Sequence, residues 1–194
     1  CASSGSDMTG AEGRSVTFHL QNLKGENLAW SFCGESILAF KLVKPLEATF
    51  FDNSYKSRVA FPEDGSALTI SQLRRSDAGT YVARNTEFRA NFTLRVYSEL
   101  LEPTVTCVSQ NCSADGCRYT LRCAAEPPGD KAFFWSNGEQ PWGEGPEVVL
   151  ETSPPGGSDP LLYTCTVQNP VSSRNATISP SALCAGESPQ KMRG

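Results

Sequence analysis

The sequence predicts an all-β protein made of two tandem sandwich domains, and three observations lead to that fold class. Short segments that alternate apolar and polar residues, such as 16–20 and 92–96, recur between turn-forming residues, and no long segment has a helical period. A motif of core and corner residues occurs twice in the 194 residues. Eight cysteines, an even number, indicate an oxidising compartment in which disulfides stabilise such domains.

The repeated motif is an aspartate followed four positions later by a tyrosine and, two positions after that, by a small core residue. This spacing is typical of the tyrosine corner of an immunoglobulin sandwich, where the tyrosine hydroxyl bonds to upstream backbone. Each copy also follows a tryptophan in the place of the buried tryptophan of that fold. The two copies with their tryptophans are Trp30, Asp77 and Tyr81, and Trp135, Asp159 and Tyr163.

The spacing inside each copy predicts two different types of immunoglobulin domain. Trp30 and Tyr81 are 51 residues apart, which leaves room for the two extra strands of a variable-type domain. Trp135 and Tyr163 are only 28 residues apart, as in a constant-type domain. We therefore expect a variable-like domain at residues 1–98, a constant-like domain at 99–186 and a polar stalk at 187–194.

The first domain lacks the disulfide that usually joins the two sheets of this fold. Leu20 and Ala83 occupy the two positions, so packing of apolar side chains must replace the cross-link. Arg58 and Asp77 stand where variable domains often carry a structural ion pair, and we expect them to support the architecture and not to perform chemistry.

The cysteines of the second domain predict two disulfides across its sheets. Cys123 and Cys165 occupy the positions of the core disulfide, with Trp135 between them in sequence. Cys117 lies six residues before Cys123 and points to the same face of an extended strand, and Cys184 closes the last expected strand. The expected pairs are Cys123–Cys165 and Cys117–Cys184, although four cysteines allow three pairings.

The other four cysteines leave alternatives open. Cys107 and Cys112 are five residues apart around a glycosylation sequon, and a local disulfide would staple the first strand of the second domain. Cys1 and Cys33 are expected near opposite rims of the first domain, so a disulfide between them requires the N-terminal segment to fold back. The alternatives for this second pair are free thiols or an intermolecular link.

Composition and motifs argue against nucleic-acid binding and against catalysis. The net charge is −4, whereas binding to phosphates usually needs a basic excess. The single histidine, His19, has the parity of a solvent-facing strand residue. No Gly-rich phosphate loop, nucleophile elbow or Cys/His zinc spacing occurs. We expect a binding protein and not an enzyme, with no cofactor, no metal and no small-molecule substrate.

Three glycosylation sequons, at Asn91, Asn111 and Asn175, agree with an extracellular location. No apolar run is long enough to span a bilayer, and Cys1 does not begin a secretory signal. We expect a mature ectodomain on the extracellular side of the plasma membrane, with its anchor outside this sequence, or a secreted protein.

The combined pattern resembles the SLAM family of leukocyte receptors. That family joins a variable-like domain without its core disulfide to a constant-like domain with Cys-x5-Cys, Tyr-x-Cys and a closing cysteine. Local strings are similar at residues 13–18, at Leu38-Ala39-Phe40 and, most specifically, at 163–172, which runs Tyr-Thr-Cys-Thr-Val-Gln-Asn-Pro-Val-Ser. The resemblance covers roughly residues 8–185.

This resemblance implies an adhesion or co-stimulatory immune receptor that binds itself or a related SLAM-family receptor on an opposing cell. Binding would use the GFCC′C″ face of the first domain, a broad sheet surface that offers about 800 Å² to each partner. One alternative is a virus-captured soluble homologue that acts as an immune decoy. Another is a passive glycoprotein spacer.

Strand parity predicts which side chains of the first domain face a partner. Phe40, if it points outward, is the best aromatic anchor, but a bulge in its strand would instead turn it into the core. Charged neighbours are expected to tune partner choice more than affinity. The sequon at Asn91 lies on the same face, so binding should centre on strands C, C′ and F, or the sequon should be unoccupied. The expected partner-binding residues are Ser31, Glu35, Phe40, Lys41, Val82, Arg84, Glu87 and Arg89.

Overall fold

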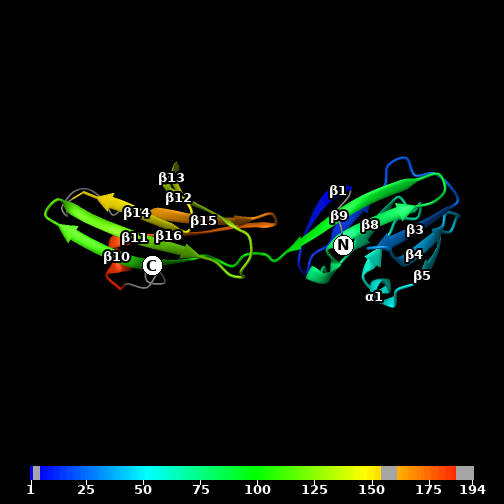
Figure 1. Ribbon diagram of the computed structural model, residues 1–194, viewed down its shortest axis with the longest axis horizontal. Coiled ribbons are helices and arrows are strands. Elements are labelled where there is room, and N and C mark those ends of the chain that lie inside the picture. The colour runs from blue at the N-terminus through cyan, green and yellow to red at the C-terminus, as the bar shows by residue number, and fades with distance from the viewer. Residues whose placement is uncertain (2–4, 154–160, 187–194) are drawn as a thin grey trace. The chain divides into compact units, whose positions relative to one another are not determined.

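The computed structural model describes residue 1 and residues 5–153 and 161–186. The chain forms two compact units, Cys1–Ser98 and Glu99–Gly194, and each has its own hydrophobic core. Strands dominate both units (Figure 1), which confirms the all-β fold class. The expected stalk at 187–194 and Asp159 of the second motif lie outside the described residues.

The first unit is a sandwich of a six-stranded and a three-stranded sheet (Figure 1). The larger sheet has the order β1-β9-β8-β3-β4-β5, in which β1 runs parallel to β9 and the other neighbours are antiparallel. Its strands are β1 (Ser6–Ala11), β3 (Asn27–Phe32), β4 (Glu35–Lys41), β5 (Glu47–Phe50), β8 (Gly79–Arg84) and β9 (Arg89–Tyr97). The smaller sheet has the order β2-β7-β6, with strands β2 (Val16–His19), β7 (Ala67–Ile70) and β6 (Val59–Ala60). The short helix α1 (Asn53–Lys56) and a 3₁₀ turn at Arg75–Asp77 complete the unit.

Strands β4 and β5 make the first unit variable-like. They lie between Trp30 and Tyr81 in sequence and extend the larger sheet beyond β3. These are the extra strands C′ and C″ of a variable-type domain. Strands β9, β8, β3, β4 and β5 therefore correspond to G, F, C, C′ and C″.

Aromatic rings fill the centre of the first unit, where this fold usually has a disulfide. The ring centroid of Phe18 lies 4.9 Å from those of Tyr81 and Phe92 and 5.9 Å from that of Trp30. All four side chains are buried, and Phe18 is 0% exposed. Tilted ring pairs at these distances add to the hydrophobic gain of burial. Ring packing thus holds the two sheets together without a covalent bond.

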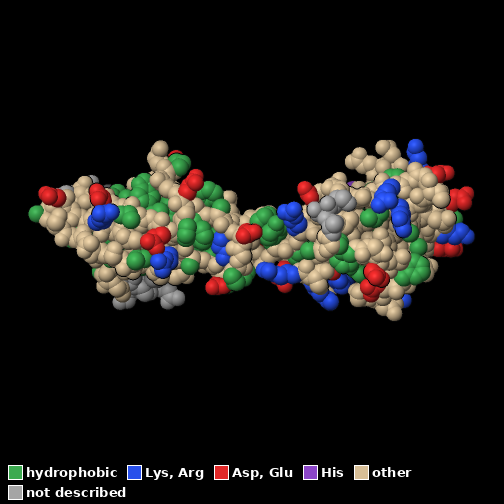
Figure 2. Space-filling view, viewed as in Figure 1, with side chains coloured by type: hydrophobic (Ala, Val, Ile, Leu, Met, Phe, Trp, Pro, Cys, Tyr) green, Lys and Arg blue, Asp and Glu red, His purple; other side chains and the backbone are tan. Residues whose placement is uncertain are grey.

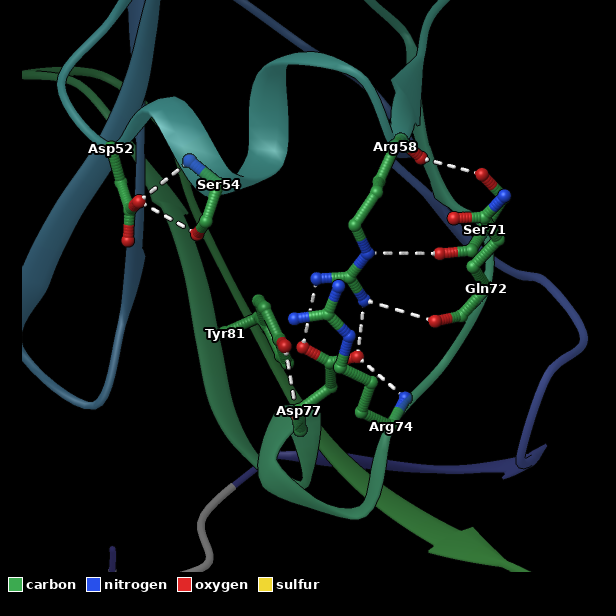
Figure 3. Close-up of polar contacts among 8 residues, drawn as sticks. All are labelled: Asp52, Ser54, Arg58, Ser71, Gln72, Arg74, Asp77 and Tyr81. Atoms are coloured by element: carbon green, nitrogen blue, oxygen red, sulfur yellow. Dashed lines mark hydrogen bonds and ion pairs between the residues drawn. The ribbon is translucent and has the colours of Figure 1, made fainter.

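A buried ion pair and the tyrosine corner of the first unit share Asp77 (Figure 3). The Arg58 guanidinium pairs with the Asp77 carboxylate, and its Nε donates to the Ser71 carbonyl at 3.2 Å. Asp77 also accepts from the Arg74 amide at 2.8 Å. Burial raises the pKa of the Tyr81 phenol, so this hydroxyl stays protonated and donates to the Asp77 carbonyl at 2.7 Å. Each of these polar groups therefore has a partner, and the cluster serves to hold the structure together.

The second unit packs a three-stranded sheet, β10-β11-β14, against a four-stranded sheet, β13-β12-β15-β16. Among the described residues of this unit, the four-stranded sheet has no strand beyond β13, so the unit is constant-like. Trp135 is buried beside the disulfide Cys123–Cys165, as expected. Its elements are β10 (Thr104–Ser113), β11 (Gly116–Ala124), β12 (Ala132–Asn137), β13 (Gln140–Glu144), β14 (Glu147–Thr152), β15 (Tyr163–Asn169), β16 (Ser172–Ile178) and α2 (Pro180–Cys184).

The other two disulfides of the second unit differ from the expected pairs, Cys117–Cys184 and Cys107–Cys112. Cys184 does not close a strand but ends α2, which packs against β10, and it bonds to Cys107 of that strand. Cys117 lies directly opposite Cys112 in the β10–β11 hairpin, and these two bond to each other. The expectation failed because it continued the last strand through Cys184 and ignored the hairpin register.

Replacing Phe18 with alanine should lower the free energy of unfolding of the first unit by about 3–5 kcal/mol, because it empties the centre of the ring cluster. Chemical denaturation of the full chain, with hydrogen exchange to locate the loss, measures this. The neighbouring change His19→Ala, at an exposed position, should have little effect. Equal stability of the two variants would contradict the assigned core.

Replacing Asp77 with asparagine should cost about 3–5 kcal/mol, because it leaves the buried Arg58 cation without its counter-charge. The matched control is Glu12→Gln, which removes an exposed partner 3.8 Å from Arg75 and should cost less than about 1 kcal/mol. Denaturant midpoints of both variants, compared in the same buffer, measure the difference. A loss no larger for Asp77→Asn than for the control would disprove the structural role of the pair.

Candidate binding face

The outer face is the side of the six-stranded sheet that faces away from the core. It is the surface on which the sequence predicts binding. Side chains alternate across each strand, so one row of the outer face can be followed from edge to edge by register. That row is Thr49, Ala39, Ala29, Arg84 and Arg89, contributed by β5, β4, β3, β8 and β9.

The structure brings most of the expected binding residues to this face or its rim. Ser31 and Val82 are half-buried and lie directly opposite each other. The charged members of the set are exposed, and they are Glu35, Lys41, Arg84, Glu87 and Arg89.

Phe40 is a correction to the expected set, because its side chain is 1% exposed and belongs to the core. Strands β3 and β4 shift register between Trp30 and Ser31, and Phe40 pairs with the buried Leu28. Its ring contacts that of Phe61, with centroids 4.7 Å apart. The bulge that turns Phe40 into the core is therefore present, and Phe40 cannot anchor a partner.

The outer face is hollowed where its side chains are smallest. Ala29 and Ala39 lie opposite each other on β3 and β4 and form the floor of a hollow of about 1110 Å³. Its rim includes charged residues of both signs, among them Glu26, Lys41, Glu47, Arg84 and Glu87. Sequence reasoning missed the floor because it searched for large side chains, and because an outward Phe40 would have turned its neighbour Ala39 toward the core.

Charges on the outer face are distributed unevenly. Arg84 and Arg89 lie directly opposite each other on β8 and β9, and in the described part of the chain neither has an ion pair. Like charges placed opposite each other destabilise a sheet. On the other side of the hollow, Lys41 lies opposite Glu47. The side of the hollow formed by β8 and β9 thus carries the two arginines, with Glu87 in the loop between these strands, and the other side carries Lys41 and Glu47.

The Cys1–Cys33 disulfide holds the N-terminal residue against the outer face, away from the hollow. Cys1 Sγ accepts a hydrogen bond from the Thr80 amide at 3.1 Å, and Thr80 lies opposite Thr93. Thr93 is only 5% exposed, although its parity places it on the outer face. Of the alternatives for these two cysteines, the structure therefore contains the intramolecular disulfide.

Asn91, the sequon on this face, lies beside Gly5 and is half-buried. Its side-chain oxygen accepts a hydrogen bond from Arg89 Nε at 3.2 Å. A side chain in place of Gly5 would collide with Asn91, because a Cβ there would lie 2.5 Å from the Asn91 carbonyl oxygen.

The described residues hold no group of three or more histidine, cysteine or acidic side chains that could bind a metal ion. All eight cysteines are in disulfides. In that same part of the chain, no helix is long and apolar enough to cross a membrane.

Comparison with curated proteins points to immune receptors. SLAM family member 5 of Mus musculus is 34% identical over 190 residues, which cover 91% of this chain and 55% of the relative. The CD48 antigen of Homo sapiens is 28% identical over 189 residues, which cover 91% of this chain and 75% of the relative. The chain spans about half the length of the first of these relatives. No protein-family model matches the chain.

Solved structures agree on the fold. The CD2-binding domain of CD58 superimposes with a TM-score of 0.69 at 19% identity, covering 90% of this chain and 96% of that chain. Murine CEACAM1b superimposes with a TM-score of 0.66 at 20% identity, covering 88% and 94%. At such identities the likeness shows the fold alone.

Two tandem immunoglobulin domains, with immune receptors as relatives, define an immune cell-surface receptor of the immunoglobulin superfamily and not an enzyme. Within that class the chain is a relative of the SLAM family, whose members match it at 25–34% identity over most of its length, and this confirms the family expected from the sequence.

Replacing Cys1 and Cys33 with serine should speed hydrogen exchange at the Thr80 amide, which loses its sulfur acceptor. Loss of the closed loop should also lower the free energy of unfolding by about 3–4 kcal/mol. The control is the corresponding double change at Cys112 and Cys117 in the second unit, which should leave Thr80 exchange unaltered. Unchanged exchange in the Cys1 and Cys33 variant would show that this contact does not form in solution.

Proposed function

We propose that this chain is the recognition part of an adhesion or co-stimulatory receptor that binds a second copy of itself or a related SLAM-family receptor on an opposing cell. Binding uses the outer face formed by β9, β8, β3, β4 and β5 and centres on the hollow. The observation that carries this proposal is the alanine floor with charged side chains of both signs around it. Four disulfides support an extracellular location.

The hollow suits a protein partner better than a small molecule. It is open, its floor is two methyl groups and its rim is charged, whereas small-molecule sites are mostly enclosed and apolar. A protruding side chain of a partner can enter the hollow and contact its floor, while the charges on the rim set the orientation of the partner and the choice of partner. An outer sheet face also supplies the roughly 800 Å² per partner of a standard interface.

An exposed aromatic residue takes the role expected of Phe40. Phe51 is 60% exposed and follows β5, whose residues Glu47 and Thr49 line the hollow. Phe51 lies two residues after Thr49, at the end of the strand that borders the hollow. Exposed aromatic side chains are frequent anchors of interfaces, so Phe51 joins the proposed binding residues in place of Phe40.

Charge distribution supports a second copy as partner. In a two-fold interface, each surface meets the same surface of the other molecule, so the arginines on one side of the hollow can face the acidic group on the other side in the second copy. Arg84 and Arg89 would then approach Glu47 of the second copy, which relieves the repulsion between the two arginines. The end of the outer face near Thr80 and Thr93 contributes less to the proposed interface, because Cys1 and Gly5 lie against it.

Arg84→Glu should weaken self-association of the full chain at least about tenfold, which corresponds to about 1.4 kcal/mol. Glu47→Lys should do the same, and an equal mixture of the two variants should recover binding, because the charges again match. Arg118→Glu, an exposed change in the second unit, is the control and should bind like the unaltered chain. Sedimentation velocity measures all five samples, the unaltered chain included.

If the unaltered chain does not self-associate, immobilised SLAM-family ectodomains replace it as partners in the same variant series. Loss of binding in Arg84→Glu but not in Arg118→Glu then supports a heterophilic receptor. Unchanged binding in both Arg84→Glu and Glu47→Lys would contradict the proposed face.

A further inference from the structure

A sequon and an exposed aromatic ring share one row of the four-stranded sheet in the second domain. Phe134 of β12 lies opposite Thr166 of β15, and Thr166 lies opposite Asn175 of β16. The adjacent residues Trp135 and Cys165 are buried, so the three members of the row point away from the core.

Phe134 leaves much of its apolar ring exposed on this face. It is 40% exposed although β12 is an inner strand, flanked by β13 and β15. Its two neighbours in the row are the exposed Glu144 and the half-buried Thr166. The second domain also exposes other hydrophobic side chains (Figure 2), but Phe134 is distinguished by its position in a row with a sequon. An exposed apolar ring on an inner strand favours the binding of a group that covers the ring.

The group that covers Phe134 can be attached to the chain itself. Asn175 is exposed, and Thr177 completes its sequon. Two strand spacings of about 4.8 Å separate the backbones of Asn175 and Phe134, and only the short side chain of Thr166 stands between them. A sugar ring joined to the amide nitrogen of Asn175 can therefore extend over β15 to the ring of Phe134.

We propose that Asn175 carries an N-linked glycan whose first N-acetylglucosamine packs its C–H face on the ring of Phe134. The negative face of an aromatic ring attracts weakly positive C–H groups, and the contact also removes apolar ring surface from water. This inference is independent of the binding face on the first domain. It assigns the outer side of β12, β15 and β16 to carbohydrate and not to a protein partner.

The attachment is a group transfer from a lipid-linked oligosaccharide diphosphate. The bond between Asn175 Nδ2 and the sugar C1 forms as the bond between C1 and the diphosphate oxygen breaks. The amide loses one proton, and the lipid diphosphate leaves. No oxidant or reductant is required.

The other two sequons lack this arrangement and serve as internal comparisons. Asn111 lies opposite Arg118 in the β10–β11 hairpin, where the cross-strand neighbour is charged and not aromatic. Asn91 already accepts a hydrogen bond from Arg89. We therefore expect a sugar at Asn111 to be freely solvated, in contrast to the sugar at Asn175.

The test uses the full chain secreted from animal cells, trimmed enzymatically to one N-acetylglucosamine per occupied site. Glycopeptide mass spectrometry should find Asn175 occupied. In proton NMR, the acetyl or ring protons of its sugar should be shifted upfield by the Phe134 ring current, and Asn175→Gln should remove these signals. In Phe134→Thr, which keeps a residue suited to a strand, the signals should return to the positions of a free glycosylated asparagine.

Val149→Thr is the matched control, because Val149 is 46% exposed in the same domain but lies on β14 of the other sheet. It should leave the shifted signals in place. Thr177→Ser, which keeps the sequon, should do the same. An unoccupied Asn175, or sugar signals that are the same with and without Phe134, would overturn the proposal.

Discussion

Strict alternation of side chains along each strand is the constraint on which both the core and the candidate binding face depend. A residue that contributes to the ring cluster leaves its neighbour on the outer face, so Trp30 in the core accompanies Ala29 on the floor of the hollow. One register shift in the pairing of β3 with β4, between Trp30 and Ser31, changes which side chains of β4 point inward. Because of that shift, the large side chain of Phe40 points into the core and the small side chain of Ala39 points to the outer face.

Features that repeat with a fixed period could be predicted from the sequence, and features that depend on where a strand ends could not. The tyrosine corner, the buried tryptophans and the ion pair of Arg58 with Asp77 follow from local spacing, and the structure contains them. The partner of Cys184 depends on the chain leaving its strand for α2, which apolar alternation does not reveal. The candidate face was predicted as a surface, but its hollow arises from residues that sequence reasoning discounts as too small.

The two domains fill the same central space by different physical means. In the first, Phe18 contacts three other rings, and ring packing fills the space between the sheets without a covalent bond. In the second, Cys123 and Cys165 join the sheets covalently beside Trp135. Packing of large rings needs close complementarity of shape, whereas a disulfide constrains the unfolded chain and tolerates looser surroundings. We infer that sequence changes in the core are less freely accepted in the first domain than in the second.

The bond between Cys107 and Cys184 has a mechanical consequence for the second domain. It joins the first strand of the second domain to the end of its last helix, enclosing a sequence separation of 77 residues. A tensile load applied to the chain before Cys107 and after Cys184 passes through this covalent bond and bypasses the hydrogen bonds of the strands between them. The enclosed strands cannot be pulled out one after another, so the second domain should extend under tension by little more than the slack outside the loop.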